Sequence, residues 1–403
     1  MIKNVVVVND YDYVQGGASL VAIETANILY EKGYNVIFFC GVSNKDKSIL
    51  NQNIKVIATN KFDFLSNPNR LKGIVQGVNN IDAYKKMLHL LENLNISETV
   101  VFIHGYTKAL STYFIKACRK YKVHTILTGH DYFSICPNGG LFNYKTNHIC
   151  NLCGTKKCKW SNCDSRNYFF KLYRNIRFLF QEHSKFRESI DFLITISETN
   201  EQLLKPYFAN SRIVRIYNPT SIDNKEDRIH CENNEYYIYV GRVDKEKGVD
   251  LLCESFKDLE EKLVIVGDGT ELEYLKLKYK NSNINFVGWV THNEALEYMK
   301  KAKALIFPSL LYEGAPLTIF EAQSLGLPVI VSKYSNGKDF ITEENGWIYD
   351  PYIKNELFHI LNDSNKIIKK SMHAYNDFWI NPFTKVMYYT SLRQIFNNIG
   401  KKV

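Results

Sequence analysis

The sequence predicts an α/β protein built from two doubly wound domains with parallel sheets. Short, continuous apolar runs such as 5–8, 263–266 and 304–307 are typical of strands that are buried on both faces. Segments with helical periodicity alternate with these runs, which favours parallel strands joined by helical crossovers. At 403 residues the chain is long enough for two domains, each with its own core.

The predicted boundaries follow the changes in composition. We expect a first domain at 1–218, with a basic, cysteine-rich insert at about 132–187. The polar run 219–234 is expected to be a linker. A second domain should occupy 235–375, and 376–403 should form a terminal helical segment.

The net charge of +9 is concentrated in one segment. Residues 145–187 contain ten Lys or Arg and two Asp or Glu, a net of +8. No nucleic-acid-binding motif accompanies this segment, so we expect no nucleic-acid partner and favour an anionic membrane surface. There is neither a signal-peptide pattern nor an apolar run long enough to span a bilayer. We therefore expect a cytoplasmic protein, peripheral on the inner face of the cell membrane.

The chain begins with a predicted βαβ unit. A strand at 5–8 leads into a loop with Gly16 and Gly17, a helix follows at about 19–31, and a second strand at 35–39. The spacing is not the Gly-x-Gly-x-x-Gly of dinucleotide binders. Paired glycines allow the backbone to approach a ligand closely, and a plain tight turn is the alternative.

Two histidines follow later strands of the first domain. The alternation continues as a strand at 54–57, a helix at 82–94, a strand at 99–103, a helix at 110–120 and a strand at 123–127. His104 and His130 come directly after two of these strands. The carboxyl ends of parallel strands form the ligand-binding edge of such a sheet, so either histidine is a candidate, and His130 is the better placed.

Five of the nine cysteines lie within the insert. They are Cys136, Cys150, Cys153, Cys158 and Cys163. In a reducing compartment such density indicates a metal site, and four of the five would make a tetrahedral zinc centre, with His148 as a substitute ligand. An iron–sulfur cluster and reduced buried or redox-active thiols are the alternatives.

A helix at about 167–187 ends the insert. Its apolar side chains share one face: Phe169, Leu172, Tyr173, Ile176, Leu179 and Phe180. The other side carries cations with two aromatics among them: Lys171, Arg174, Arg177, Phe170 and Phe178. Interleaved aromatics and cations favour contact with anionic lipid through Phe170 and Phe178. The alternative is a core helix whose outer face is basic.

The second domain opens with a glycine turn between two cations. The strand 236–240 runs into Gly241 and Arg242, and Lys247-Gly248 follows just before a helix. Arg offers a bidentate fork for phosphate and Lys a mobile point charge. Together they could hold a diphosphate and neutralise it as a leaving group.

The most informative stretch is 308–332. A strand at 304–307 leads into a loop with Gly314 and Pro316, then a helix at 317–325 ended by Gly326, and a strand at 328–331. Glu313 lies in the loop and Glu321 about one turn into the helix. A helix start in this position favours an anionic ligand.

These motifs resemble those of the retaining GT-B glycosyltransferases of the glycosyltransferase family 4 type, the group 1 enzymes of bacterial surface polysaccharide assembly. Glu313-x7-Glu321 with its Gly-Ala-Pro-Leu insert resembles their Glu-x7-Glu signature, and Gly241-Arg242-x4-Lys247-Gly248 resembles their Gly-Arg-x4-Lys-Gly motif. The resemblance implies two Rossmann-like domains with parallel sheets facing across a cleft, and a C-terminal helix that crosses back to the first domain.

The resemblance also implies roles for single residues. Glu321 would bind the ribose hydroxyls and Glu313 the hydroxyls of the donor sugar. Arg242 and Lys247 would stabilise the diphosphate leaving group. Val290 would contact the base through its backbone, and His130 would contact the transferred sugar. The remaining implied donor contacts come from the loop at Gly16 and Gly17 and from the loop and helix start at Gly314, Ala315, Pro316 and Leu317.

The activity implied is transfer of a sugar from a UDP- or GDP-sugar to a hydroxyl of a lipid-linked saccharide in O-antigen, capsule or exopolysaccharide synthesis. We expect no Asp-x-Asp near the site, so the protein's cations would carry the leaving-group charge and no cofactor would be required. A nucleotide-sugar epimerase of the same fold and a non-catalytic sugar-nucleotide-binding protein are the alternatives.

Overall fold

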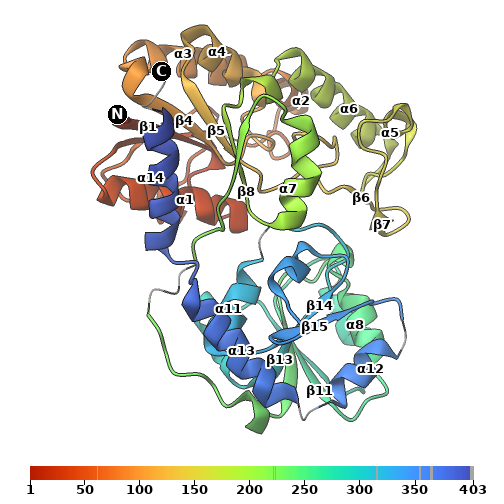
Figure 1. Ribbon diagram of the computed structural model, residues 1–403. Coiled ribbons are helices and arrows are strands. Elements are labelled where there is room, and N and C mark those ends of the chain that lie inside the picture. The colour runs from red at the N-terminus through yellow and green to blue at the C-terminus, as the bar shows by residue number, and fades with distance from the viewer. Residues whose placement is uncertain are drawn as a thin grey trace. The chain divides into compact units, whose positions relative to one another are not determined.

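The computed structural model describes residues 1–60, 62–220, 222, 224–314, 316–353, 355–363 and 366–399. The chain divides into two compact units. The first comprises Met1–Leu141, Asn151–Pro219 and Lys385–Val403, and the second comprises Phe142–Cys150 and Thr220–Thr384. Each contains one main sheet with helices around it, as Figure 1 shows. Each unit is therefore described by itself.

The sheet of the first unit has seven strands, all paired in parallel. In spatial order they are β3 (Lys55–Ala58), β2 (Asn35–Val42), β1 (Asn4–Tyr11), β4 (Thr99–Ile103), β5 (His124–Thr128), β8 (Phe192–Thr195) and β9 (Arg212–Arg215). Its centre is apolar, and Val5 to Val8 are fully buried. The strand order reverses between β1 and β4, and ligands of such sheets bind at the carboxyl ends of the strands at that point.

Helices cover both faces of this sheet. They are α1 (Gly17–Glu31), α2 (Arg70–Val78), α3 (Ile81–Glu92), α4 (Ile115–Tyr121), α5 (Lys156–Trp160), α6 (Tyr168–His183), α7 (Glu198–Leu204) and α14 (Lys385–Ile399). Several begin at an Asn or Ser whose side chain accepts a backbone N–H of the first turn, as Asn69, Asn80, Asn167 and Ser197 do.

The C-terminal helix α14 belongs to the first unit, as the resemblance implied. Its residues Tyr388, Leu392 and Phe396 are buried in the same apolar cluster as β1 and α1. Hydrogen bonding between the hydroxyls of Thr25 and Tyr388 (2.8 Å) and an ion pair from Lys385 to Glu24 (2.9 Å) attach α14 beside α1 (Figure 1). The chain leaves the second unit at Thr384, after the expected position of 376, because α13 continues to Ile380.

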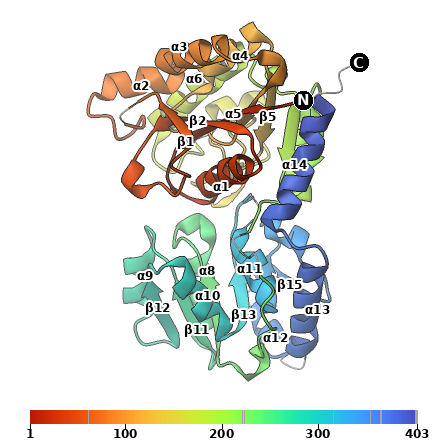
Figure 2. The ribbon, with the colours of Figure 1, turned by 90° about the vertical axis from the view of Figure 1, so that its left-hand side faces the viewer.

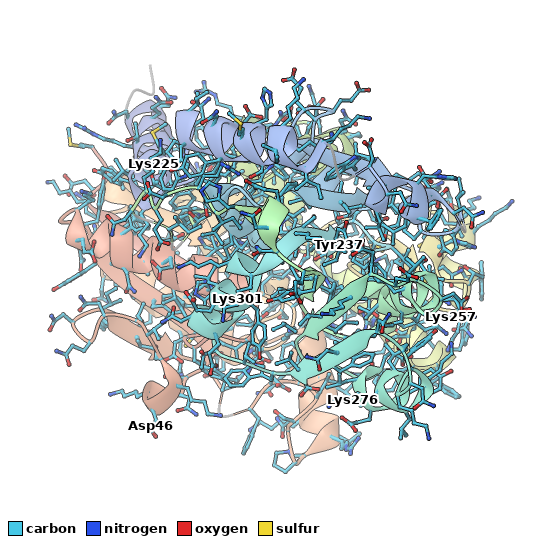
Figure 3. The ribbon with its side chains drawn as sticks, turned by 90° about the horizontal axis from the view of Figure 1, so that it is seen from below. Asp46, Lys225, Tyr237, Lys257, Lys276 and Lys301 are labelled. Atoms are coloured by element: carbon cyan, nitrogen blue, oxygen red, sulfur yellow. The ribbon has the colours of Figure 1, made fainter. Side chains whose placement is uncertain are left out.

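The second unit contains a six-stranded parallel sheet. In spatial order its strands are β12 (Ile284–Gly288), β11 (Lys262–Val266), β10 (Tyr236–Val240), β13 (Ala302–Phe307), β14 (Val329–Ser332) and β15 (Gly346–Tyr349). The order reverses between β10 and β13. Tyr237 of β10, labelled in Figure 3, lies buried inside this unit, whereas Lys257 and Lys276 extend at its edge.

The helices of the second unit are α8 (Val249–Phe256), α9 (Leu272–Lys278), α10 (His292–Lys300), α11 (Leu317–Leu325), α12 (Glu356–Leu361) and α13 (Ile367–Ile380), seen from the side in Figure 2. A short antiparallel hairpin, β6 (Phe142–Asn143) and β7 (His148–Ile149), clusters with this unit although it lies in the insert. Within the described ranges, no helix has the length and apolar character needed to cross a membrane.

Candidate functional site

The candidate site residues of the second unit lie at the carboxyl ends of β10 and β13, where the strand order reverses. β10 ends at Gly241 and Arg242, and β13 ends in the loop that carries Glu313. Lys247 donates from Nζ to Oε2 of Glu313 across 2.6 Å. Both side chains are largely buried, with exposed fractions of 14% and 15%. The two strongest sequence motifs thus meet in one ion pair.

Backbone contacts hold these two motifs together. Gly248 has a φ of +69°, and a Cβ at this position would lie 2.3 Å from the carbonyl oxygen of Pro308. Leu310 donates its backbone N–H to the carbonyl of Glu246 across 3.0 Å. Only glycine permits this backbone conformation without strain and this close approach. The glycine of the Arg-x4-Lys-Gly motif therefore positions Lys247 against the loop of Glu313.

Glu313 has a second support and one unused oxygen. Asn336 donates from Nδ2 to the backbone carbonyl of Glu313 across 2.6 Å. Oε1 of Glu313 is buried, and among the described residues it has no hydrogen-bond partner. A buried carboxylate oxygen without a donor is an acceptor for a ligand hydroxyl.

Arg242 is more exposed than Lys247, at 64% of its side chain. It pairs with Asp244 through Nη1 and lies 3.8 Å from Glu246 through Nη2. Asp244 also accepts the backbone N–H of Thr270 across 3.0 Å. These contacts hold the Arg242 side chain at the start of the same turn as Lys247, where its exposed guanidinium is accessible to a ligand.

Glu321 has a partner that the sequence analysis did not identify. Nε2 of His292, the first residue of α10, lies 2.9 Å from Oε1 of Glu321. This hydrogen bond raises the pKa of His292, while partial burial opposes the rise. Val290, the expected base contact, lies just before α10, next to the exposed Trp289.

The loop before α11 provides the remaining expected donor contacts. Pro316 precedes the helix and Leu317 is its first residue. Gly314 precedes them, close to Glu313. Ala315 lies outside the described residues, so its backbone N–H remains part of the sequence prediction only.

In the first unit, Gly16 and Gly17 form the start of α1. Gly16 precedes the helix with a φ of +149°, a conformation that favours glycine, and both glycines are exposed. A Cβ at either position would meet no described atom within 4 Å. The loop after β1 therefore presents open backbone at the carboxyl edge of the sheet, and its contact with a donor stays a prediction.

His130 is paired with the second candidate histidine. Nδ1 of His104 lies 2.9 Å from Nε2 of His130, and the rings stack with centroids 5.2 Å apart. Burial lowers the pKa of His130 to about 4 and that of His104 well below its ordinary value. Nε2 of His104 is buried without a described partner. Both rings are neutral near pH 7, so one donates to the other.

Two acidic residues near this pair were missed. Burial raises the pKa of Asp131 to about 6. Asp10 is buried, and its carboxylate accepts the backbone N–H groups of Lys108, Ala109 and Leu110. Asp10-x-Asp12 is an acidic pair in the sequence, yet Asp12 accepts the backbone N–H of Asn44, so both carboxylates stabilise loops.

Two cysteines of the insert lie near each other, because burial and then the nearby Cys158 raise the pKa of Cys136. Cys153 donates from Sγ to the carbonyl of Ile135, and Asn138 contacts the carbonyl and the Sγ of Cys163. Cys136 is buried and Cys150 half-buried. Among the residues that the structure describes, no three His, Cys, Asp or Glu side chains are placed to hold a metal ion. The zinc site thus remains a prediction from the sequence.

One thiol of the insert has an unusual neighbour, and His148 is placed elsewhere. Lys171 of α6 is completely buried, and its Nζ lies 3.8 Å from Sγ of Cys158. His148 packs against the ring of Tyr352 in the second unit. His148 thus belongs to the second unit, whereas Cys136, Cys153, Cys158 and Cys163 belong to the first.

The structure brings together the expected residues within each unit. Glu313 meets Lys247 in the second unit, and His130 meets His104 in the first. Periodicity and motif spacing could not reveal that His104 pairs with His130 or that His292 binds Glu321, because these contacts join distant strands and helices. Nor could they reveal the raised pKa of Asp131, which depends on burial.

Part of the chain matches a known protein family. Residues 221–374 match the family described as "Glycosyl transferases group 1". An uncharacterised glycosyltransferase of Haemophilus influenzae is 26% identical over 344 residues, covering 83% of this chain and 82% of that protein. The UDP-Gal:alpha-D-GlcNAc-diphosphoundecaprenol alpha-1,3-galactosyltransferase of Escherichia coli is 29% identical over 177 residues, which cover 40% of this chain and 42% of that enzyme.

Solved structures share the fold. Anabaena Alr3699/HepE in complex with UDP superposes with a TM-score of 0.68 at 15% identity, covering 98% of this chain and all of that one. The apo form of the lipopolysaccharide outer core galactosyltransferase WaaB gives a TM-score of 0.62 at 18% identity. At these identities the likeness concerns architecture.

Proposed function

We propose a specific reaction for this glycosyltransferase. Its residues 221–374 match the group 1 glycosyl transferases, and its fold is of the GT-B type. It transfers a sugar from a UDP- or GDP-sugar to a hydroxyl of a lipid-linked saccharide, with retention of the anomeric configuration. The product contributes to a surface polysaccharide or lipopolysaccharide. Two relatives support this, because the Escherichia coli galactosyltransferase is named for a diphosphoundecaprenol-linked sugar and a similar enzyme of Erwinia amylovora for amylovoran biosynthesis.

The ion pair of Lys247 and Glu313 is the observation that carries the proposal. The Lys247 ammonium would bind the diphosphate, and Arg242 would add a second cation from the same turn. Oε1 of Glu313, buried without a described partner, would accept a hydroxyl of the donor sugar. As the bond to the leaving group breaks, negative charge grows on the diphosphate. Cations placed beforehand stabilise that charge.

Glu321 and the start of α11 would bind the rest of the nucleotide. Glu321 would accept the ribose hydroxyls while His292 holds its carboxylate in place. Backbone N–H groups at Leu317 lie at the positive end of the α11 dipole, which favours phosphate oxygens. The strand end at Val290 would contact the base.

The first unit would supply the groups for the transferred sugar. We assign His130 to a sugar hydroxyl, because a neutral imidazole can donate or accept a hydrogen bond. Gly16 and Gly17 would let the backbone approach the donor. The acceptor is expected at a membrane surface, where the protein would be peripheral.

A panel of nucleotide sugars with lipid-linked saccharide acceptors tests this function. Transfer to the acceptor, with release of a nucleoside diphosphate and an unchanged anomeric configuration by NMR, would support it. A changed sugar nucleotide without acceptor would indicate an epimerase. Tight nucleotide binding without any turnover across the panel would indicate a binding protein and contradict the proposal.

A further inference from the structure

Helix α6 is oriented in the opposite way to an ordinary surface helix of a globular protein, which buries its apolar side. Its cationic side faces the protein and its apolar side faces outward. The outward side chains are Phe169, Leu172, Ile176, Leu179 and Phe180, with Phe169 exposed to 80%. On a globular domain such a stripe ordinarily packs into the core. The alternative from the sequence, a core helix with a basic outer face, is therefore wrong.

Specific hydrogen bonds fix this orientation. Arg177 donates from Nε to the carbonyl of Gly77 across 2.8 Å and from Nη2 to the carbonyl of Thr107. Arg174 pairs with the fully buried Asp164 across 2.7 Å. These polar groups are bound inside the first unit, so turning the helix over would leave them unsatisfied.

The inner side of α6 also supports the loop that follows His130. Gln181 donates from Nε2 to the carbonyls of Phe133 and Ser134. Arg174 donates to the carbonyl of Asn138 across 3.2 Å. Helix α6 thus anchors the loop that follows His130, the candidate sugar-binding residue of the same unit.

Two neighbouring helices extend the apolar surface. Tyr173 of α6 donates to the carbonyl of Ile74 in α2 across 3.0 Å, and Figures 1 and 2 both show α2 beside α6. α2 exposes Leu71, Ile74 and Val75. Asn175 of α6 donates to the carbonyl of Lys159 in α5, which exposes Trp160 to 79%. We name the exposed side chains of α2, α5 and α6 the α2–α6 surface.

The exposed charges of α2 and α5 are all positive. Arg70 and Lys72 of α2 and the three lysines of α5 are exposed. Neither α2 nor α5 contains an acidic residue. The acidic residue of α6, Glu182, is in its last turn and pairs with Arg187. Apolar side chains bordered mainly by cations complement a bilayer with anionic headgroups.

We propose that the α2–α6 surface docks this protein on an anionic lipid bilayer, with Phe169, Ile176 and Trp160 entering the interface. The two aromatics named from the sequence do not form this surface. Phe170 is half-buried under the guanidinium of Arg166, and Phe178 lines an inner pocket with Arg177. Docking by exposed apolar side chains with nearby cations needs no acceptor. The inference agrees with a lipid-linked acceptor but can be tested separately from it.

Flotation with vesicles of phosphatidylcholine alone, and with one quarter phosphatidylglycerol, tests the docking. The full chain is expected to bind the anionic vesicles. Phe169→Ser with Ile176→Ser should reduce that partitioning at least about tenfold, because each large apolar side chain loses its transfer into the interface. Leu277→Ser, which changes an equally exposed leucine of α9, is the matched control and should have no effect.

Charge reversal provides the second arm. Lys156→Glu with Lys159→Glu should reduce partitioning to anionic vesicles at low salt, whereas Lys45→Glu with Lys47→Glu, two exposed lysines of the same unit, should not. Circular dichroism and nucleotide binding should be unchanged in every variant, which separates this inference from the proposed transfer reaction.

Three outcomes would overturn the proposal. The wild-type chain could fail to bind the anionic vesicles. The Phe169 and Ile176 double variant could bind as well as wild type. Or the wild-type chain could form a dimer that this double variant dissociates while neither binds vesicles, which would make the α2–α6 surface a contact between copies.

Discussion

Breaking the ion pair of Glu313 and Lys247 from either side should give opposite effects on nucleotide binding. Its atoms lie 2.6 Å apart with about one seventh of each side chain exposed. Removing one partner of a fully buried pair destabilises a protein by about 3–5 kcal/mol, because the other charge is left without compensation. The residual exposure here lowers our expectation to about 2 kcal/mol for Lys247→Met, measured by urea unfolding.

Lys247→Met should also weaken the binding of a nucleoside diphosphate. Loss of charge-assisted hydrogen bonds to a diphosphate is worth about 1.5–3 kcal/mol, or roughly 10–100-fold in Kd. Glu313→Gln removes a carboxylate beside the same anionic ligand and releases the ammonium from its partner. Its Kd for a nucleoside diphosphate should be unchanged or up to about tenfold tighter.

Calorimetric titration of both variants with UDP and with GDP measures these changes. Lys245→Met, an exposed lysine of the same turn, is the matched control and should leave the Kd within twofold of wild type, because its charge is not paired at the site. Equal weakening by Glu313→Gln and Lys247→Met would refute the division of roles. So would a Kd that Lys247→Met leaves unchanged.

Three further predictions concern the first unit. Burial raises the pKa of Asp131 to about 6 in the folded state, against 3.8 in the unfolded state, so this group opposes folding increasingly above pH 3.8 and fully above pH 6. Asp131→Asn should therefore raise the Tm at pH 7.5 by an amount worth about 1–2 kcal/mol and lose that advantage by pH 3.5. An equal change at both pH values would contradict this cause. His104→Phe removes the hydrogen-bond partner of His130 Nε2, so the ¹⁵N NMR spectrum of His130 should change from one dominant tautomer to a mixture of two; an unchanged spectrum would exclude the pairing as the cause of the tautomer preference. Elemental analysis tests the cysteine pattern, which predicts about one zinc per chain; none bound, with all nine thiols titratable, would end the prediction.

Much of the fold could be predicted because it depends on local patterns. The buried run Val5 to Val8, the glycine turns after β1 and β10, and the helix from Leu317 to Leu325 appear in the structure close to the predicted bounds. These features follow from alternation, glycine positions and helix ends, which neighbouring residues determine.

What could not be predicted depends on contacts between distant elements. Periodicity divides α6 into two faces, but it does not say which face is buried; Asp164, Gly77 and Thr107 decide that, because they bind its arginines. His104 and His130 follow different strands, and they meet because β4 and β5 are neighbours in the sheet. A linear pattern contains neither fact.

The transfer rate of Glu313→Gln, beside that of wild type, tests the central claim most directly. With a nucleotide sugar and a lipid-linked acceptor, wild type should form a product with the donor's anomeric configuration. Glu313→Gln should lower kcat by at least about 100-fold while it still binds the nucleoside diphosphate, because its carboxylate acts on the donor sugar and not on the phosphates. Undiminished transfer by Glu313→Gln, or an inverted product from wild type, would contradict the account.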